Sequence, residues 1–342
     1  MRKSAGAALF AALVTVLLAQ AAAAQEVRGT WFASPGHDSR GAPTLNLNVR
    51  NREMGMTSMD VAIGELAGFP GGERYTGAAR FTLRREAGSF AFSGSFENGE
   101  GVGNYTFVPD PAFATALARR GLQRPTAEQQ RTMALHDVGV TFLDEMAAQG
   151  YARTTTAGMV RAAEHGAGLR FLREMGGLGY RMGTLEALVT LRDHGVTPTF
   201  VRALAEMGYR RVTPDQATRL RDHGVSTEFI REMDGLGHRG LALEELVRLR
   251  DHGVSTSFIR EMEQLGYRNL PLDELVRMRD RGLTASFIRE MNQLGYRNLP
   301  LNELVRLRDH GVNARFVAQT NSRAGRRLSI PELVSVKDRG ER

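Results

Sequence analysis

The sequence contains no cysteine, a single tryptophan at Trp31 and only two lysines, Lys3 and Lys337. Without cysteine the chain can form no disulfide bond, has no thiol nucleophile and has no cysteine to carry a lipid. The apolar stretch near the N-terminus is too short and too rich in alanine for a membrane-spanning helix, and no later segment approaches the roughly 18 continuous apolar residues that such a helix needs. These absences favour a soluble protein with no membrane span, whose fold depends on packing alone.

The first 24 residues have the pattern of a secretory signal peptide. Arg2 and Lys3 give a charged start, residues 7–18 are apolar, and a run of small residues ends at Ala24. We therefore expect cleavage near Ala24 and an exported protein, periplasmic or extracellular, whose mature chain starts near Gln25.

The formal net charge is +7, and removal of Arg2 and Lys3 leaves +5 by the same count (7 − 2). A basic chain can bind nucleic acid. Here, however, acidic residues are interspersed with arginine along the C-terminal part, which is typical of a solvated surface. Together with export, this mixture argues against a nucleic-acid partner.

From residue 110 onward the sequence repeats every 29 residues, which gives about eight units. Phenylalanine marks the register at Phe113, Phe142, Phe171, Phe200, Phe229, Phe258, Phe287 and Phe316. A cationic residue marks it at His136, His165, His194, His223, His252, Arg281, His310 and Arg339. A Gly-Tyr pair ends at Tyr151, Tyr180, Tyr209, Tyr267 and Tyr296, with His238 standing in once. Such a period is typical of a stacked array, which mostly offers surface to partners.

Each unit has the signals of two short helices. In residues 254–281, Ser255 is a good N-cap, and Gly266 can end the first helix in the left-handed conformation. The apolar stripe between them consists of Phe258, Ile259, Met262 and Leu265. A second helix begins near Pro271, and other units start it with a capping box at Thr126, Thr213 and Ser329. Because such short helices are marginal alone, the pattern predicts an α-solenoid of helical hairpins over residues 109–342.

The two ends of the array carry different signals. In the last unit Thr320 and Arg323 replace apolar residues of the stripe, as expected for a polar capping repeat. At the other end, Asp110 and Pro111 start the first helix directly after the last expected strand. We therefore expect the N-terminal module to cover the first unit.

Residues 25–108 alternate with a period of two, which predicts antiparallel strands. The inward positions include Leu45, Leu47, Val49, Phe81, Leu83, Phe90, Phe92 and Phe96. Asn98-Gly99 predicts a hairpin turn, because this pair tolerates positive φ angles. The expected fold class is α+β: a small antiparallel β-sheet module followed by an α-solenoid of about eight 29-residue helical-hairpin repeats.

Two segments together indicate a family. Residues 243–267 read LEELVRLRDHGVSTSFIREMEQLGY, and residues 80–113 contain RFTLRREAGSFAFSGSF followed by GVGNYTFVPDPAF. The chain resembles a group of bacterial envelope proteins with helical repeats of the form RDHGV…FIREM…LGY. In some relatives the same module is appended to membrane metallopeptidases of the beta-lactam-sensor type. The resemblance covers nearly all of the mature chain and implies an envelope sensing or interaction role, without catalytic residues.

The sequence predicts no reaction centre. Arg281 and Arg339 replace histidine in the cationic series, and equivalent positions lie one repeat apart, too far for one ion with nitrogen bonds of about 2.0–2.1 Å. A cation at a helix C-terminus instead suits the macrodipole. The sequence has no His-Glu-x-x-His, no Gly-x-Ser-x-Gly and no phosphate loop. We therefore expect no metal site, no cofactor and no enzymatic activity.

Two arginine rows of the same period are the candidate partner-binding residues. The loop row follows each Gly-Tyr pair or its equivalent: Arg181, Arg210, Arg239, Arg268, Arg297 and Arg326. The helix row lies on the first helix of successive units: Arg173, Arg202, Arg231, Arg260 and Arg289. Such rows suit an extended acidic partner, an envelope protein or peptide. The alternative is that they pair with acidic residues of the array such as Glu232, Glu261 and Glu290, in exposed pairs that contribute about 0–1 kcal/mol each.

A second hypothesis places function in the β module, as a sensor of a small molecule or envelope ligand. Gly29-Thr30-Trp31 is similar to the Gly-x-Trp of the first lipocalin strand, which makes Trp31 the candidate ligand-binding residue. However, about 80 residues are too few for an eight-stranded barrel that holds a ligand. The alternative is that Trp31 is a core residue of a small sheet. The partner's identity and the oligomeric state stay open.

Overall fold

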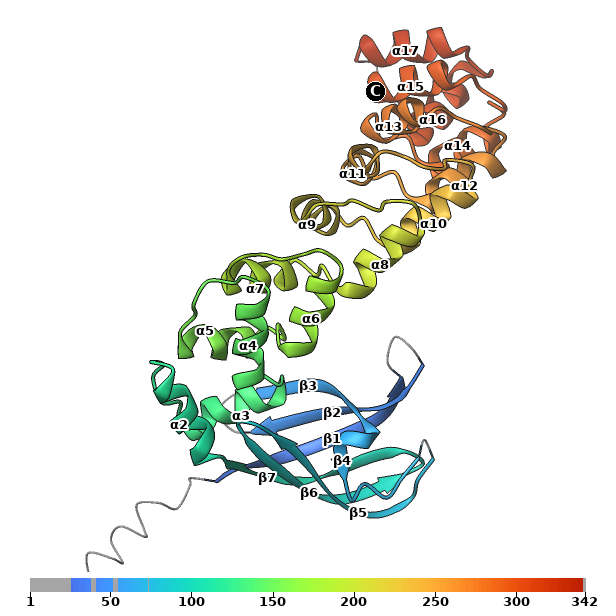
Figure 1. The fold of residues 1–342 in the computed structure, drawn as a ribbon. Helices are drawn as coiled ribbons and strands as arrows, with labels where there is room; N and C mark the ends of the chain where they lie inside the picture. The colour runs from blue at the N-terminus through green and yellow to red at the C-terminus, as the bar shows by residue number, and fades with distance from the viewer. Residues whose placement is uncertain (1–25, 38–40, 52–54, 73, 341–342) are drawn as a thin grey trace, which may run out of the picture. The chain divides into compact units, whose positions relative to one another are not determined.

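The computed structural model describes residues 26–37, 41–51, 55–72 and 74–340. The expected signal peptide lies outside these residues. Within them, a curled antiparallel sheet of seven strands precedes sixteen short helices that pack in pairs (Figure 1). The predicted fold class, a β-sheet module followed by an α-solenoid of helical hairpins, is confirmed. The chain divides into two compact units between Arg202 and Ala203.

The sheet has the strand order β3-β2-β1-β7-β6-β5-β4. Its strands are β1 (Val27–His37), β2 (Pro43–Asn51), β3 (Gly55–Ala62), β4 (Leu66–Ala67), β5 (Gly77–Arg85), β6 (Gly88–Glu97) and β7 (Glu100–Pro109), with a 3-10 helix η1 (Ile63–Glu65) before β4. The predicted hairpin turn is present, because Asn98 and Gly99 between β6 and β7 have φ angles of 51° and 88°.

One face of the sheet carries the core, as the period of two predicts. Trp31 on β1 lies opposite Gly103 on β7 and is 2% exposed. Its ring contacts those of Phe81, Phe92 and Phe96 at centroid distances of 5.4, 6.1 and 5.5 Å. The rest of this face is apolar too, so the aromatic residues of β5 and β6 form one cluster around the tryptophan.

Helices α2 to α7 follow the sheet within the N-terminal unit. They are α2 (Pro111–Arg119), α3 (Ala127–Leu135), α4 (Val140–Ala148), α5 (Thr156–Glu164), α6 (Leu169–Gly177) and α7 (Leu185–Asp193), and α8 (Pro198–Glu206) spans the division between the units. Helices α2, α4 and α6 contact one another in succession, and so do α3, α5 and α7. Because α3 packs against β1, β6 and β7, the sheet covers the first repeat as the sequence predicts.

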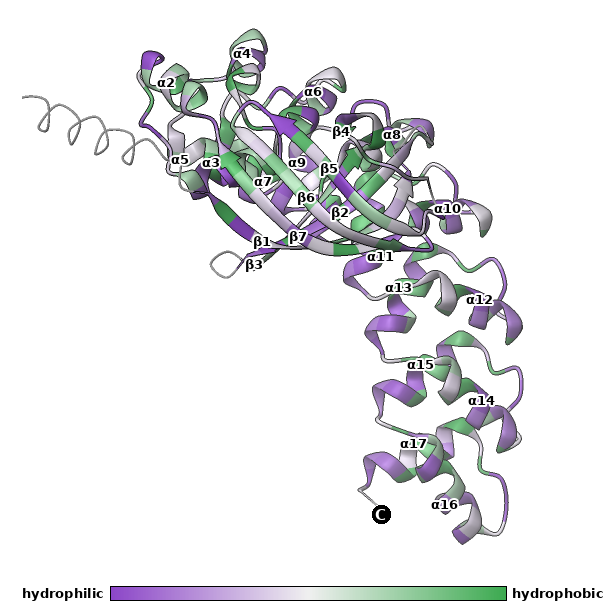
Figure 2. Ribbon diagram, turned by 90° about the horizontal axis from the view of Figure 1, so that it is seen from below, coloured by the Kyte–Doolittle hydropathy of each residue, from purple (hydrophilic) through white to green (hydrophobic). Residues whose placement is uncertain are grey.

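The C-terminal unit continues the same arrangement. Its helices are α9 (Pro214–Asp222), α10 (Thr227–Gly235), α11 (Leu243–Asp251), α12 (Thr256–Gln264), α13 (Leu272–Asp280), α14 (Ala285–Gln293), α15 (Leu301–Asp309), α16 (Ala314–Ala324) and α17 (Ile330–Asp338). Helices α10, α12, α14 and α16 contact one another in succession. Hydrophilic and hydrophobic residues succeed one another within these helices (Figure 2), as expected when one face packs on neighbouring units.

The helices begin and end at the predicted signals. The side chain of Ser255 accepts a hydrogen bond from the backbone N–H of Phe258, and three capping boxes start with Thr126, Thr213 and Ser329. At the end of α12, Gly266 has a φ of 96°, and the N–H of Tyr267 donates to the carbonyl of Met262 at 2.9 Å. This is the glycine-dependent helix ending expected from the sequence.

Candidate functional site

The cationic series joins consecutive repeats. The ring Nδ1 of His252 lies 2.6 Å from Oδ1 of Asp280, the aspartate of the next unit. The equivalent pairs are His165 with Asp193, His223 with Asp251, Arg281 with Asp309 and His310 with Asp338. Each of these histidines and Arg281 stands at the C-terminus of its own helix, as predicted, but its side chain contacts the next unit. The series is therefore part of the stacking.

In five units, the basic residue before the aspartate that pairs with the preceding unit packs on the phenylalanine that marks the repeat. The guanidinium carbon of Arg279 lies 5.1 Å from the ring centroid of Phe258. The equivalent pairs are Arg192 with Phe171, Arg250 with Phe229, Arg308 with Phe287 and Lys337 with Phe316. These contacts combine burial of the side-chain stem with attraction to the ring face.

The tyrosine of the Gly-Tyr pair makes the third contact between units. In three units its hydroxyl donates a hydrogen bond to a carbonyl 32 residues further along, in the loop of the next unit, whereas the hydroxyl of Tyr151 accepts one from the backbone N–H of Met182. The pairs are Tyr209 with Leu241 at 2.8 Å, Tyr267 with Leu299 at 2.7 Å and Tyr296 with Leu328 at 2.6 Å. Members of all three marker series thus make contacts between units, and both arginine rows lie outside these series.

Most of the helix row of arginines is paired inside the array. Each paired arginine contacts the glutamate 28 residues earlier: Arg173 with Glu145 at 2.9 Å, Arg202 with Glu174 at 2.6 Å, Arg260 with Glu232 at 3.3 Å and Arg289 with Glu261 at 3.1 Å. Arg231 differs, because the equivalent earlier position holds Ala203, and no ion pair involves it in the described part of the chain. The helix row therefore follows the alternative interpretation, in which its arginines pair with acidic residues of the array.

The loop row differs from the helix row. Arg181, Arg210, Arg239, Arg268 and Arg297 are all exposed, and within residues 26–340, apart from the undescribed gaps, none of their side chains has an ion pair or hydrogen bond. The last member, Arg326, contacts Glu332 at 2.6 Å. The guanidinium of Arg326, together with donors from Ser329, lowers the pKa of Glu332 to about 2. Five positive charges of this row therefore remain available at the surface.

Trp31 lies in the core of the sheet, in agreement with the second interpretation of the sequence, that of a core residue. Its indole N–H donates to the carbonyls of Asn104 at 3.1 Å and Ser93 at 3.3 Å. With 2% of its surface exposed, the side chain offers no face to a ligand in this conformation.

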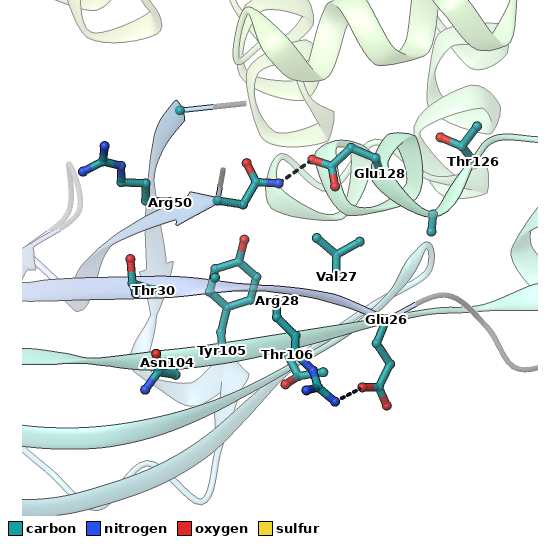
Figure 3. Close-up of a pocket in the computed structure, with 14 residues that line it drawn as sticks. Glu26, Val27, Arg28, Thr30, Arg50, Asn104, Tyr105, Thr106, Thr126 and Glu128 are labelled. Carbon is teal, nitrogen blue, oxygen red and sulfur yellow. Dashed lines mark hydrogen bonds and ion pairs between the residues drawn. The ribbon is translucent and has the colours of Figure 1, made fainter. Parts of the chain in front are cut away.

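The β module does have a pocket, away from Trp31, where α3 covers the end of the sheet. It has a volume of about 1170 Å³ and is lined by β1, the end of β2, β7 and the start of α3. Figure 3 shows Tyr105 projecting from its strand toward the helix that carries Glu128. The hydroxyl of Tyr105 is buried near the guanidinium of Arg131, and no hydrogen bond of good geometry reaches it from the described residues. Burial raises the pKa of this tyrosine.

A buried charge lies beside this pocket. Arg131 on α3 is 2% exposed, and its Nε donates to Glu128 at 2.8 Å. The amide of Asn51 on β2 donates to the same carboxylate at 3.0 Å. Sequence reasoning missed this cluster, although the signal was present: all later units but one place valine where the first has Arg131, as at Val189 and Val247, and the exception is Thr218.

Two other observations bear on the site. In the described part of the chain, no group of three or more His, Asp or Glu side chains is arranged to hold a metal ion. Among the same residues, no helix has both the length and the hydrophobicity needed to cross a bilayer.

No protein-family model matches the chain, and no curated protein matches it.

Proposed function

We propose that this chain is an exported, non-enzymatic interaction protein whose helical repeats bind an acidic protein or peptide of the bacterial envelope. The observation that carries the proposal is the contrast between the two arginine rows. Arg260 and Arg289 of the helix row are neutralised by glutamates of the preceding units. Arg268 and Arg297 of the loop row are exposed and unpaired among the described residues.

The spacing of the loop row suits an extended partner. Helices α10, α12 and α14 contact one another in succession, and Arg239, Arg268 and Arg297 follow them at equivalent positions. Packed helices lie about 8–10 Å apart. A peptide in the extended polyproline II conformation has three residues per turn and rises about 3.1 Å per residue, so every third side chain lies on one face, about 9 Å apart. A carboxylate at every third residue of such a peptide would therefore meet successive arginines.

Charge reversal tests this proposal. The double variant Arg268→Glu/Arg297→Glu should lose capture of the acidic partner from an envelope extract, and should lose binding of a poly-glutamate peptide. The matched control is Arg306→Glu/Arg315→Glu, which changes the net charge by the same amount at two exposed arginines, one on α15 and one on α16. Unchanged binding by the first variant, or equal losses in both, would contradict a specific role for the loop row.

Export is part of the proposal and is supported by the signal-like residues 1–24. Expression of the whole chain in a bacterium, followed by N-terminal sequencing of the periplasmic and extracellular fractions, should give a start near Gln25. Retention of the uncleaved chain in the cytoplasm would contradict it.

The pocket beside Tyr105 supports a second candidate function, the binding of a small polar molecule by the β module. A buried hydroxyl without a partner is costly unless a ligand or water satisfies it. When a library of polar metabolites is tested one compound at a time, we expect a compound that binds the pocket to raise the melting temperature of the wild type but not of Tyr105→Phe. Equal shifts in both proteins would place binding elsewhere.

A further inference from the structure

Of the six internal units of the array, one lacks the tyrosine that the other five have. At Tyr209 and Tyr267 the phenol donates to the carbonyl 32 residues later. The unit between them has His238, and the corresponding carbonyl belongs to Leu270. Over the residues that the structure describes, no hydrogen bond reaches the carbonyl of Leu270, and the imidazole of His238 has no partner. Histidine is shorter than tyrosine, so the contact between these two units is incomplete.

A pocket of about 330 Å³ lies at this position. Its lining includes His238, Met262, Tyr267, Leu270, Pro271 and Leu275. Met262 and Leu275 are fully buried, so the floor of the pocket is apolar, while the rim carries the imidazole and the free carbonyl. An apolar cavity of this size with a few polar groups is typical of a site for a small ring.

We propose that this pocket receives a tyrosine side chain of the partner, whose phenol occupies the place that the chain's own tyrosine fills in neighbouring units. The inference rests on the proposed function and names the partner's chemistry. The phenol would donate to the carbonyl of Leu270, as Tyr209 and Tyr267 donate to theirs. An aliphatic side chain would leave that carbonyl unsatisfied, which disfavours it.

Charge complementarity extends the site along the array. Arg239 follows His238 directly, and Arg268 follows Tyr267, so one unpaired cation flanks the pocket in each of the two units that form it. Glu263 also lines the pocket and disfavours a carboxylate directly beside the ring. The partner segment is therefore an acidic peptide with one tyrosine, whose carboxylates lie toward Arg239 and Arg268.

The first test uses p-cresol, the tyrosine side chain as a free molecule, and the mature chain with labelled methionine methyl groups. p-Cresol should shift the NMR signal of the Met262 methyl group in the wild type and not in His238→Tyr. This variant restores the residue of the equivalent positions, so it should fold and close the pocket. His238→Ala, which leaves the pocket open, should keep the shift. No shift of Met262 in the wild type would overturn the inference.

The second test separates the pocket from the arginine row. We would compare two peptides, Asp-Glu-Asp-Tyr-Asp-Glu-Asp and the same peptide with alanine at the centre. The wild type should bind the tyrosine peptide about tenfold tighter or more, and His238→Tyr should bind both equally. Equal binding of both peptides to the wild type would overturn the pocket inference, even if binding still required Arg268 and Arg297. In Arg268→Glu/Arg297→Glu, a tyrosine preference that survives with weaker binding of both peptides would support the pocket and the arginine row, whereas a surviving preference with unchanged affinity would support the pocket and contradict the row.

Discussion

Nδ1 of His252 lies 2.6 Å from Oδ1 of Asp280, the aspartate of the following repeat. The residue before that aspartate, Arg279, packs on Phe258, and the residue after it, Arg281, contacts Asp309 of the unit beyond. Three consecutive residues of one motif therefore make three separate contacts of the array. The most regular part of the sequence is structural, and the candidate binding residues lie beside it.

The stacked arginine should matter for stability. Arg279→Ala removes the cation–π contact with Phe258 and the packing of the side-chain stem, so the free energy of unfolding should fall by about 1–2 kcal/mol. Arg268→Ala, an exposed and unpaired control, should change it by less than about 0.5 kcal/mol. Urea denaturation followed by circular dichroism measures both, and equal effects would contradict the structural role of the motif.

The buried charge on α3 depends on its glutamate. Glu128→Ala leaves Arg131 without its counter-charge in a site that is 2% exposed, and this should cost about 3–5 kcal/mol of stability. The control is Glu244→Ala at the equivalent position of α11, where an exposed pair with Arg219 contributes about 0–1 kcal/mol. Arg131→Met added to Glu128→Ala should restore much of the loss. A loss no larger than that of Glu244→Ala would contradict the burial of this charge.

Acid should destabilise the chain through His136. Burial, with a smaller contribution from Arg192, lowers the pKa of His136 to about 4, whereas an unfolded histidine titrates near 6.5. Because the unfolded state binds the proton first, stability is unaffected above about pH 6.5 and falls as the pH drops toward 4. Between pH 7.5 and 5.0 the wild type should lose about 2 kcal/mol more than His136→Gln. Parallel urea titrations at the two pH values measure this difference, and equal losses would contradict the shift.

The core around Trp31 requires glycine on the neighbouring strand. A Cβ at Gly103 would lie 2.1 Å from the carbonyl oxygen of Ser93 and 2.8 Å from Nε1 of Trp31. Gly103→Ala should therefore disrupt the sheet and shift the emission of the chain's only tryptophan to longer wavelength. Gly64→Ala, where an added Cβ meets no atom within 4 Å, should leave the emission unchanged. An unshifted spectrum for Gly103→Ala would contradict the close approach of Trp31 to β7.

The domain organisation shows how tertiary contacts add to a sequence pattern. The sequence predicts a boundary after residue 108, and β7 does end at Pro109. The two compact units of the structure, however, divide later in the chain, between Arg202 and Ala203. The physical reason is that α3 packs on β1, β6 and β7, which joins the first repeats to the sheet.

The sequence by itself determined the repeat period, the helix ends and the strands. These depend on interactions within a few residues, such as the cap at Ser255, the left-handed Gly266 and the alternation along each strand. Only the tertiary structure decided which arginines are neutralised, because Arg289 meets Glu261 across two units whose relative rotation no local pattern specifies. For the same reason, the burial of Arg131 and the pocket at His238 became visible only when the elements were packed against one another.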